Sequence, residues 1–537
     1  MGEPLSIGIE GQLALRARWP WWTVPLALLI PAAIFALGLT SPLHMQDDHL
    51  IFQLTGRTGE LSAPLSYGQH IRIDMENRGR FRPLWCVSYL WMAQAIGPRP
   101  AILHLWPYSL LLVSTLLLLA VGRSLGMSGW LSIVLAWLVV LNPRGREVWY
   151  MLAPSEKIAL VLSLVAVLAI IRGTLARRRW AWDGLAVLTA GGAGCAKESF
   201  VLAIPALMVM RLSLDLLLAG RPWRQALTRN VAFFLALAAV LAVDLVFIRL
   251  AFQSKAYSQA LMEGVPLGKG IARVLKHGWD SNVFLIPVGV FMAAYFARGW
   301  FRDARIRNGL LAMLAITLVW LLPTAGLQAK IGGAPGRWIF PLTLSLTFAN
   351  AMAFAFVYGR ARPEHRRILN LAILVWFAWC GLKSFAGLSE FLASARVMQT
   401  TVAAIDRTVP PEGRVLIAAD TVKQVEMAQS LQRYLAGTGR GDIRVDVLDV
   451  PAGPRSPSQQ AAVARYGREY FHFVTDPDLS AYDALVGAPP TKPLPRPVAD
   501  RLPPDLRRAE LSEPYYPLRP GSPWRETFEA SLYLRQR

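Results

Sequence analysis

Cysteine and charge are both scarce in this 537-residue sequence. Its three cysteines, Cys86, Cys195 and Cys380, lie far apart in or beside apolar segments, so they indicate neither a disulfide framework nor a zinc site. Charged residues make up 17% of the chain and hydrophobic residues 54%, with a mean hydropathy of +0.37. This balance excludes a soluble multidomain enzyme and predicts an integral membrane protein.

Acidic residues are scarcer than basic ones, at 35 against 56, which gives a formal net charge of +21. In a soluble protein this excess would suggest nucleic acid, but here most arginines lie in short connections between apolar runs, so no nucleic acid is expected. By the positive-inside rule, the basic connections are cytoplasmic, the N-terminus is inside, and the segment after about residue 389 is outside. We expect a bacterial inner-membrane protein. The basic connections are Arg16/Arg18, Arg123, 171–179, 220–229, 298–307 and 359–367.

The apolar runs predict an α-helical polytopic protein with about eleven transmembrane helices, since about 20 apolar residues cross the hydrocarbon. The first run ends in small residues at 36–38, as a signal peptide does, but it is long and a polytopic bundle follows it, so we expect it uncleaved. The predicted spans are 20–40, 101–122, 128–142, 156–172, 182–196, 199–219, 230–250, 281–297, 308–325, 338–358 and 368–388.

Polar residues gather in the predicted outer connections. Asp47 and Asp48 open the first of these, a connection of roughly sixty residues, which is long enough to suggest function. It also contains an aromatic-rich segment, 79–100, that we expect to lie along the membrane interface. Charges at the ends of spans are costly unless they are paired or face water, so their gathering on one side predicts a shared polar cavity. The other outer charges are Arg80, Arg82, Glu147, Lys197, Glu198 and Arg337.

The order of these motifs resembles the C-type (GT-C) membrane glycosyltransferases. It is most similar to the polyprenyl-phosphate-mannose-dependent O-mannosyltransferases with tetratricopeptide repeats, and less so to the lipid A aminoarabinose transferases. The resemblance covers roughly the first 390 residues, and this chain lacks the C-terminal repeats. The shared elements are Asp47-Asp48, R-P-L at 82–84, H-L at 104–105, N-P before Glu147, K-E at 197–198 and R-(aromatic)-x-x-P from Arg337.

The resemblance implies an inverting transfer of a sugar from a polyprenyl-phosphate donor to an extracytoplasmic acceptor, which could be a cell-envelope glycan, a lipid or a protein. Asp48 becomes the general base, with Asp47 beside it, because a carboxylate can take the proton of the attacking hydroxyl. Cations stabilise the leaving phosphate. The phosphate candidates are Arg82, Lys197 and Arg337, and the residues expected to orient the groups or the acceptor are Glu147, Glu198, Arg80 and His104.

Each of these residues also has a structural interpretation. The Asp47-Asp48 pair could cap a helix beginning at His49, or bind Mg²⁺ or Mn²⁺ together with His44 and His49. Arg82 could snorkel to the interface and Arg337 could anchor its span. Lys197 and Glu198 could form a structural ion pair, and His104 could pack between helices.

A transporter or lipid flippase is the alternative function. It would place ionisable residues near the middle of the membrane, and Asp244 within 230–250 is the one candidate of this kind. A non-enzymatic scaffold would need no acidic pair at the membrane face.

The chain becomes polar from about residue 395, which divides it into a transmembrane domain, 1–394, and an extracytoplasmic domain, 395–537. Alternation of strand-like and helix-like segments predicts a small α/β domain there, expected by analogy to dock the acceptor. The Gly-rich 437–442 is read as a helix stop and 489–504 as an extended connector. The expected elements are strands at 414–420, 443–450 and 482–488, a helix at 421–439, and a helix followed by a strand in 456–476.

Overall fold

The computed structural model describes most of the chain outside residues 254–361. The described residues are 20–43, 48, 50–56, 65–125, 127–141, 146–176, 178–217, 219–253, 362–451, 472–488, 493–516 and 525–536, with short pieces between 266 and 341 and between 453 and 464. The predicted span at 281–297 therefore lies outside the described residues, and only 340–341 of 338–358 are described. Of the predicted span 308–325, residues 315–316 and 318–325 are described, and they are helical.

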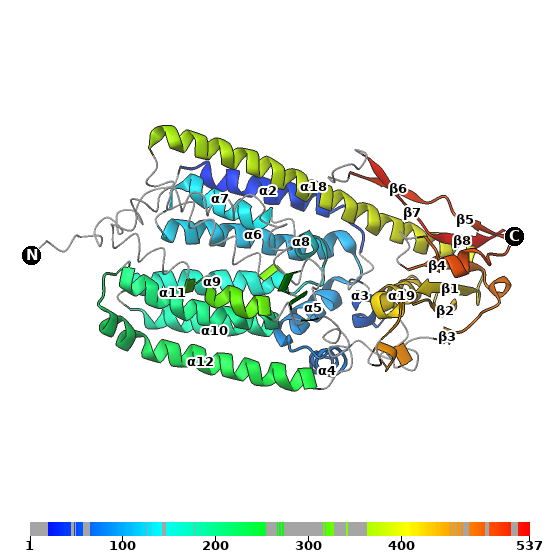
Figure 1. Cartoon of the computed structure of the whole chain (residues 1–537), viewed down its shortest axis with the longest axis horizontal. Helices are drawn as coiled ribbons and strands as arrows, with labels where there is room; N and C mark the ends of the chain where they lie inside the picture. The colour runs from blue at the N-terminus through cyan, green and yellow to red at the C-terminus, as the bar shows by residue number, and fades with distance from the viewer. Residues whose placement is uncertain are drawn as a thin grey trace, which may run out of the picture.

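A bundle of long apolar helices fills one half of the molecule, as predicted (Figure 1). Among the described residues, five helices are long and apolar enough to cross a membrane. Exposed apolar side chains such as Leu371, Leu374 and Val375 line the outer surface of the last long helix, as lipid-facing positions require. The bundle helices are α2 (Thr23–Gly38), α6 (Pro100–Ser124), α7 (Gly129–Val140), α9 (Glu156–Leu175), α10 (Trp180–Ala196), η2 (Glu198–Ala203), α11 (Ile204–Leu217), α12 (Trp223–Gln253) and α18 (Pro363–Thr408).

Four short helices lie at one end of this bundle: α3 (Leu50–Leu54), α4 (Tyr67–Arg78), α5 (Pro83–Ile96) and α8 (Arg146–Tyr150) (Figure 1). Ser66 caps α4 through a capping box with Gln69, and Gly79 ends it with a positive φ of 62°. Helix α5 confirms the helix predicted within 79–100. The basic connections after α6 and α9 and before α18 lie at the opposite end of the bundle (Figure 1). The two ends thus differ in the way the charge pattern predicts.

Helix α18 is 46 residues long and continues out of the bundle into the C-terminal domain (Figure 1). The predicted boundary at residue 395 therefore falls inside a continuous helix. The domain contains a six-stranded sheet in the order β3-β2-β1-β4-β8-β5, in which β1 to β4 are parallel. The strands and helices are β1 (Arg414–Ala419), α19 (Thr421–Gly437), β2 (Arg444–Asp449), β3 (His472–Val474), η4 (Leu479–Ala481), β4 (Ala484–Gly487), α21 (Arg496–Ala499), β5 (Leu506–Arg508), β6 (Ser512–Tyr515), β7 (Glu526–Glu529) and β8 (Leu532–Arg535).

The α/β prediction is confirmed for β1, α19, β2, β3 and β4. The expected extended connector at 489–504 is wrong in part, because it contains the short helix α21. Proline is tolerated in the first turn of a helix, which explains how Pro497 fits there. The strands after residue 504 were not predicted. Of these, β6 and β7 pair with each other beside α18, and the ring of Tyr516 stacks on that of Phe385 with centroids 6.3 Å apart.

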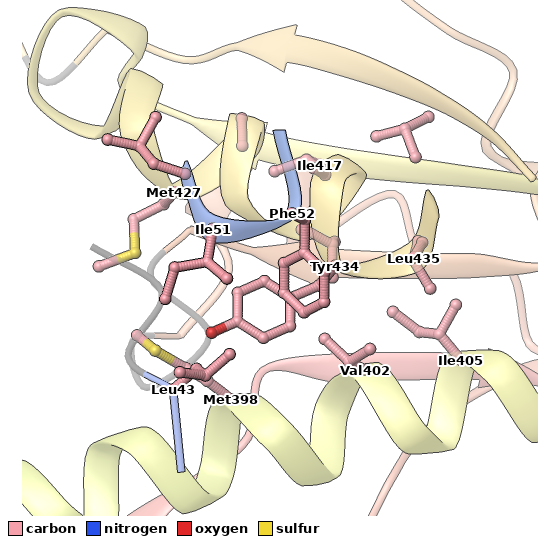
Figure 2. Packing of buried hydrophobic residues seen from close by; sticks show 14 of the residues in the cluster. Leu43, Ile51, Phe52, Met398, Val402, Ile405, Ile417, Met427, Tyr434 and Leu435 are labelled. Atoms are coloured by element: carbon pink, nitrogen blue, oxygen red, sulfur yellow. The ribbon is translucent and has the colours of Figure 1, made fainter. Parts of the chain in front are cut away.

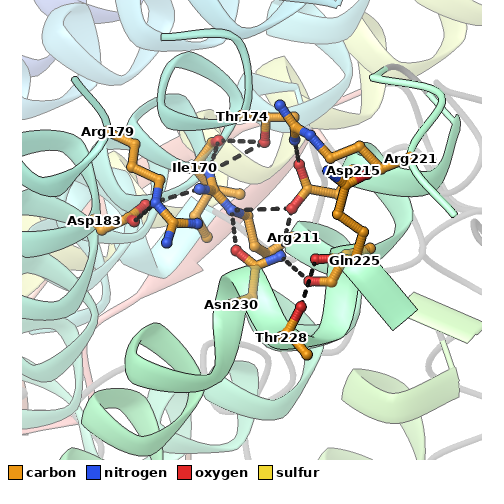
Figure 3. Close-up of polar contacts among 11 residues, drawn as sticks. Ile170, Thr174, Arg179, Asp183, Arg211, Asp215, Arg221, Gln225, Thr228 and Asn230 are labelled. Atoms are coloured by element: carbon orange, nitrogen blue, oxygen red, sulfur yellow. Dashed lines mark hydrogen bonds and ion pairs between the residues drawn. The ribbon is translucent and has the colours of Figure 1, made fainter. Parts of the chain in front are cut away.

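A buried polar network joins four helices at the basic end of the bundle (Figure 3). Arg211 of α11 is fully buried and donates to Ile170 O and Thr174 Oγ1 of α9, at 2.9 and 3.1 Å. Its guanidinium also lies 3.1 Å from Asp183 of α10 and 3.9 Å from Asp215. Asn230 of α12 accepts from Arg211 Nε at 3.0 Å. This network fixes the helices relative to one another.

Arg211→Leu should destabilise the protein by up to about 3–5 kcal/mol, because it removes the buried cation between Asp183 and Asp215 and leaves them with the partly exposed Arg179 and Arg221. Arg224→Leu is the matched control, since Arg224 is exposed at the same end of the bundle. The free energy of unfolding in detergent micelles measures the difference. Equal stability of the two variants would contradict a structural role for the network.

Candidate functional site

Asp48 is buried where the first and second outer connections meet. Its Oδ1 accepts hydrogen bonds from the backbone N–H groups of Leu152 and Ala153, at 3.0 and 3.4 Å. Trp85 of α5 donates through Nε1 to Ala153 O at 2.6 Å, so the same loop is held from a second side. Asp48 also lies two residues before α3, and its backbone carbonyl accepts from Ile51 N at 3.1 Å. The carboxylate is therefore bound to a loop about a hundred residues away in sequence.

Lys157 supports this loop from its other face. Its buried ammonium donates to the carbonyl oxygens of Met151 and, at 3.4 Å, of Leu152. The loop thus presents its N–H groups to an anionic side chain and its carbonyls to a cationic one. This arrangement fixes the orientation of Asp48.

Three ion pairs connect the predicted cations with carboxylates at the same end of the bundle. Arg82 binds Asp74 through two hydrogen bonds, from Nη2 at 2.7 Å and from Nε at 3.1 Å. Its guanidinium also lies 4.1 Å from the centre of the Trp85 ring. Arg82 is buried and does not reach outward as a snorkelling residue would.

Lys197 and Glu198, which are adjacent in sequence, each form an ion pair with a residue from another connection. Lys197 Nζ lies 3.1 Å from Glu156 Oε1 at the start of α9. Glu198 Oε1 lies 4.0 Å from Arg80 Nε, so this pair is looser. Each of these neighbours in sequence therefore has a partner from a different connection. Lys197 links α10 to α9, and Glu198 links η2 to the segment before α5.

Burial lowers the pKa of Lys197, although the negative charges of Glu156 and Glu198 act in the opposite direction. Burial also lowers the pKa of Arg82, but Asp74 and then Glu198 more than offset it, so the net pKa is raised. Because Arg80 and Arg82 both contribute to the shift at Lys197, the three cations act on one another. They form one electrostatic cluster.

His104 lies on α6, buried beside the backbone of Ser41 and Pro42. Its ring stacks on that of Tyr108 one turn later, with centroids 5.8 Å apart. Helix α2 ends very close by, because a Cβ on Gly38 would lie 1.6 Å from Tyr108 Oη. The structure therefore places His104 next to the chain that leads into Asp48.

The remaining predicted residues are not placed. Asp47, Arg337, His44 and His49 lie outside the described residues, and of Glu147 only the backbone is described. Among the described residues, no three His, Cys, Asp or Glu side chains are grouped to hold a metal ion. Asp48 alone does not make such a site, and its Oδ1 accepts N–H groups, so we derive no step through Mg²⁺ or Mn²⁺.

The sequence did not predict the residues that surround the predicted site residues. They are Asp74 beside Arg82, Glu156 beside Lys197, and Lys157 and Tyr434 in the surroundings of Asp48. A signal was present for two of them, since Glu156 and Lys157 open an apolar span, where charges are rare.

Asp244, the candidate for a mid-membrane charge, lies against the last turns of α10. Cys195 Sγ donates to its Oδ1 at 3.8 Å, and a Cβ on Gly194 would lie 2.4 Å from its Oδ2.

No family model and no curated protein matches this chain. Among solved structures, it is similar to ArnT from Cupriavidus metallidurans in the apo state, with 12% identity, a TM-score of 0.49, and 95% of this chain and 97% of that chain covered. ArnT bound to undecaprenyl phosphate gives 12% identity, a TM-score of 0.45 and the same coverage.

The archaeal oligosaccharyltransferase AglB from Archaeoglobus fulgidus, in complex with an inhibitory peptide and a dolichol-phosphate, is also similar. It gives 10% identity and a TM-score of 0.46, over 87% of this chain and 69% of that chain.

Proposed function

We propose that this protein is an inverting glycosyltransferase, which moves a sugar from a polyprenyl-phosphate donor to an acceptor hydroxyl at the outer face of the bacterial inner membrane. The observation that carries the proposal is the position of the buried Asp48 at the same end of the bundle as the Arg80, Arg82 and Lys197 cluster. A base for the acceptor and cations for the leaving phosphate are what a single displacement requires.

In this reaction the acceptor hydroxyl gives its proton to Asp48 while its oxygen attacks the anomeric carbon of the donor sugar. The bond from that carbon to the phosphate oxygen breaks, and polyprenyl phosphate leaves with the electron pair. The backbone N–H groups of Leu152 and Ala153 donate to Oδ1 of Asp48 and fix its direction. Asp48 is thereby a well-oriented base.

Lys197 and Arg82 are proposed to bind the donor phosphate, since both are buried cations held in place by a carboxylate. Arg337 is the third phosphate candidate from the sequence. Glu198 and Arg80 are proposed to orient this cluster, and Glu147, His104 and Asp47 to act near the acceptor. These roles rest on the sequence resemblance as well as on the described geometry.

A transporter is disfavoured by where the buried charges of the described residues lie. The Arg211 network occupies the basic end of the bundle. Asp244 contacts Cys195 near the end of α10, and Cys195 is only two residues before Lys197 in the sequence. A substrate path through the membrane would favour charges between these two levels.

The test is a transfer assay with purified protein in nanodiscs and a panel of polyprenyl-phosphate sugars. We expect release of polyprenyl phosphate that depends on an acceptor from cell-envelope extract. Movement of intact donor across a proteoliposome membrane, without cleavage, would favour a flippase instead.

The sidedness of the chain gives a separate prediction. Because the basic connections and the C-terminal domain lie at opposite ends of the bundle, reporters joined after residue 179 and after residue 537 should report opposite compartments. A periplasm-active enzyme and a cytoplasm-active enzyme fused at each position make the measurement. A cytoplasmic signal from the C-terminal fusion would overturn both the orientation and the use of an outer-face donor.

A further inference from the structure

The C-terminal domain packs directly on the helix that follows Asp48 (Figure 2). The rings of Phe52 in α3 and Tyr434 in α19 meet edge to face, with centroids 4.9 Å apart. Met398 and Val402 of α18 belong to the same buried cluster, and Figure 2 shows them beneath the Tyr434 ring. One hydrophobic core therefore joins the bundle end, α18 and the α/β domain.

Gly437, at the end of α19, allows the two helices to approach this closely. A Cβ at this position would lie 2.2 Å from Phe52 Cδ1 and 2.7 Å from two further atoms of that ring. Phe52 is buried, so its ring has little room to move away. Glycine is required here because of space.

Helix α3 is held on most of its surface, and of its five residues only Gln53 is partly exposed. Leu50, Ile51, Phe52 and Leu54 are all buried, between α5 on one side and α19 on the other. The helix begins two residues after Asp48, whose carbonyl it binds through Ile51 N. A displacement of α3 would therefore displace Asp48.

Tyr434 lies within reach of the charge on Asp48. Burial raises the pKa of the Tyr434 hydroxyl well above its usual range, and the negative charge of Asp48 raises it further. Tyr434, a residue of the C-terminal domain, thus lies near the carboxylate of Asp48 and also packs on α3.

We propose that the C-terminal domain positions Asp48, by holding α3 between α19 and α5 through Gly437 and Tyr434. This inference rests on the function proposed above for the catalytic role of Asp48, and it makes Gly437 and Tyr434 positioning residues. The domain then completes the site, whatever part it has in binding the acceptor. Misplacing a reacting group by about 1 Å can cost about 10²-fold in rate, so even a small shift of α3 has a large effect.

The decisive variant is Gly437→Val, which forces a side chain into the Phe52 ring. Gly441→Val is the matched control, because a Cβ there has its nearest neighbour at 4.0 Å. The double variant Gly437→Val/Phe52→Ala removes the clash and tests for rescue. Three quantities are measured in nanodiscs: amide hydrogen exchange of residues 50–54, affinity for undecaprenyl phosphate, and turnover of the donor.

Gly437→Val should speed exchange at residues 50–54 and lower turnover about 10²-fold, with affinity for undecaprenyl phosphate unchanged. The control should match the wild type, and the double variant should recover part of the turnover. Unchanged exchange in Gly437→Val would overturn the packing role, and faster exchange with normal turnover would overturn the positioning role. If the wild-type protein transfers no sugar, the proposed function fails, and a normal exchange pattern in Gly437→Val would then still refute the contact itself.

Discussion

Asp48→Asn should abolish sugar transfer while the affinity for polyprenyl phosphate stays close to that of the wild type. Asparagine keeps an Oδ1 that can accept from the N–H groups of Leu152 and Ala153, so the local structure is retained. It cannot take a proton from the acceptor, and loss of a general base costs about 10²–10⁴-fold in rate. Turnover and donor affinity are measured on both proteins in the same nanodiscs.

Asp47→Asn is the natural control, and a milder loss is expected because the neighbouring carboxylate is not proposed as the base. Near-normal turnover in Asp48→Asn would mean that the carboxylate only fixes the start of α3 and the 151–154 loop. Loss of activity in both variants, with recovery in excess Mg²⁺ or Mn²⁺, would instead favour a metal site at the acidic pair.

The membrane-spanning elements could be predicted because each span consists of a continuous run of apolar residues. The parallel strands β1 and β4 were predictable for a similar reason, since buried strands are largely apolar. Strand β2 was predictable from apolar residues that alternate with charged ones. Strands β5 to β8 were missed because they are short and only partly buried, so they lack the apolar run that marks the equally short β4. Nothing local in such a segment distinguishes a strand from a loop.

Site residues could likewise be predicted where the signal lies in the neighbouring sequence, but not where it depends on contacts with distant residues. Asp48 and Lys197 could be found because charges at the ends of apolar runs are rare. Their partners could not, because Glu156 lies 41 positions from Lys197 and Leu152 lies 104 from Asp48. Lys197 and Glu198 are adjacent in sequence, but their ion pairs with Glu156 and Arg80 join them to two different connections. The contact between Phe52 and Tyr434 depends on how the transmembrane and C-terminal domains pack, and no local sequence pattern predicts that packing.

Lys197→Met should lower turnover by about 10²–10³-fold if Lys197 stabilises the leaving phosphate, by analogy with lost oxyanion donors. The same change leaves Glu156 buried without its cation, at a cost in stability of about 3–5 kcal/mol. A loss of activity in this variant alone would therefore not separate a phosphate ligand from a structural ion pair.

The double variant Lys197→Met/Glu156→Gln separates the two roles, because it leaves no charge buried without a partner. For a phosphate ligand, the double variant should regain stability in detergent unfolding while turnover and affinity for polyprenyl phosphate stay low. For a structural pair, stability and turnover should recover together, and that result would remove Lys197 from the donor site. Arg72→Met/Glu76→Gln provides the matched control, since this exposed pair lies in α4 at the same end of the bundle, with a separation of 2.9 Å. An exposed pair of this kind contributes only about 0.3–0.5 kcal/mol, so its removal should change neither quantity measurably.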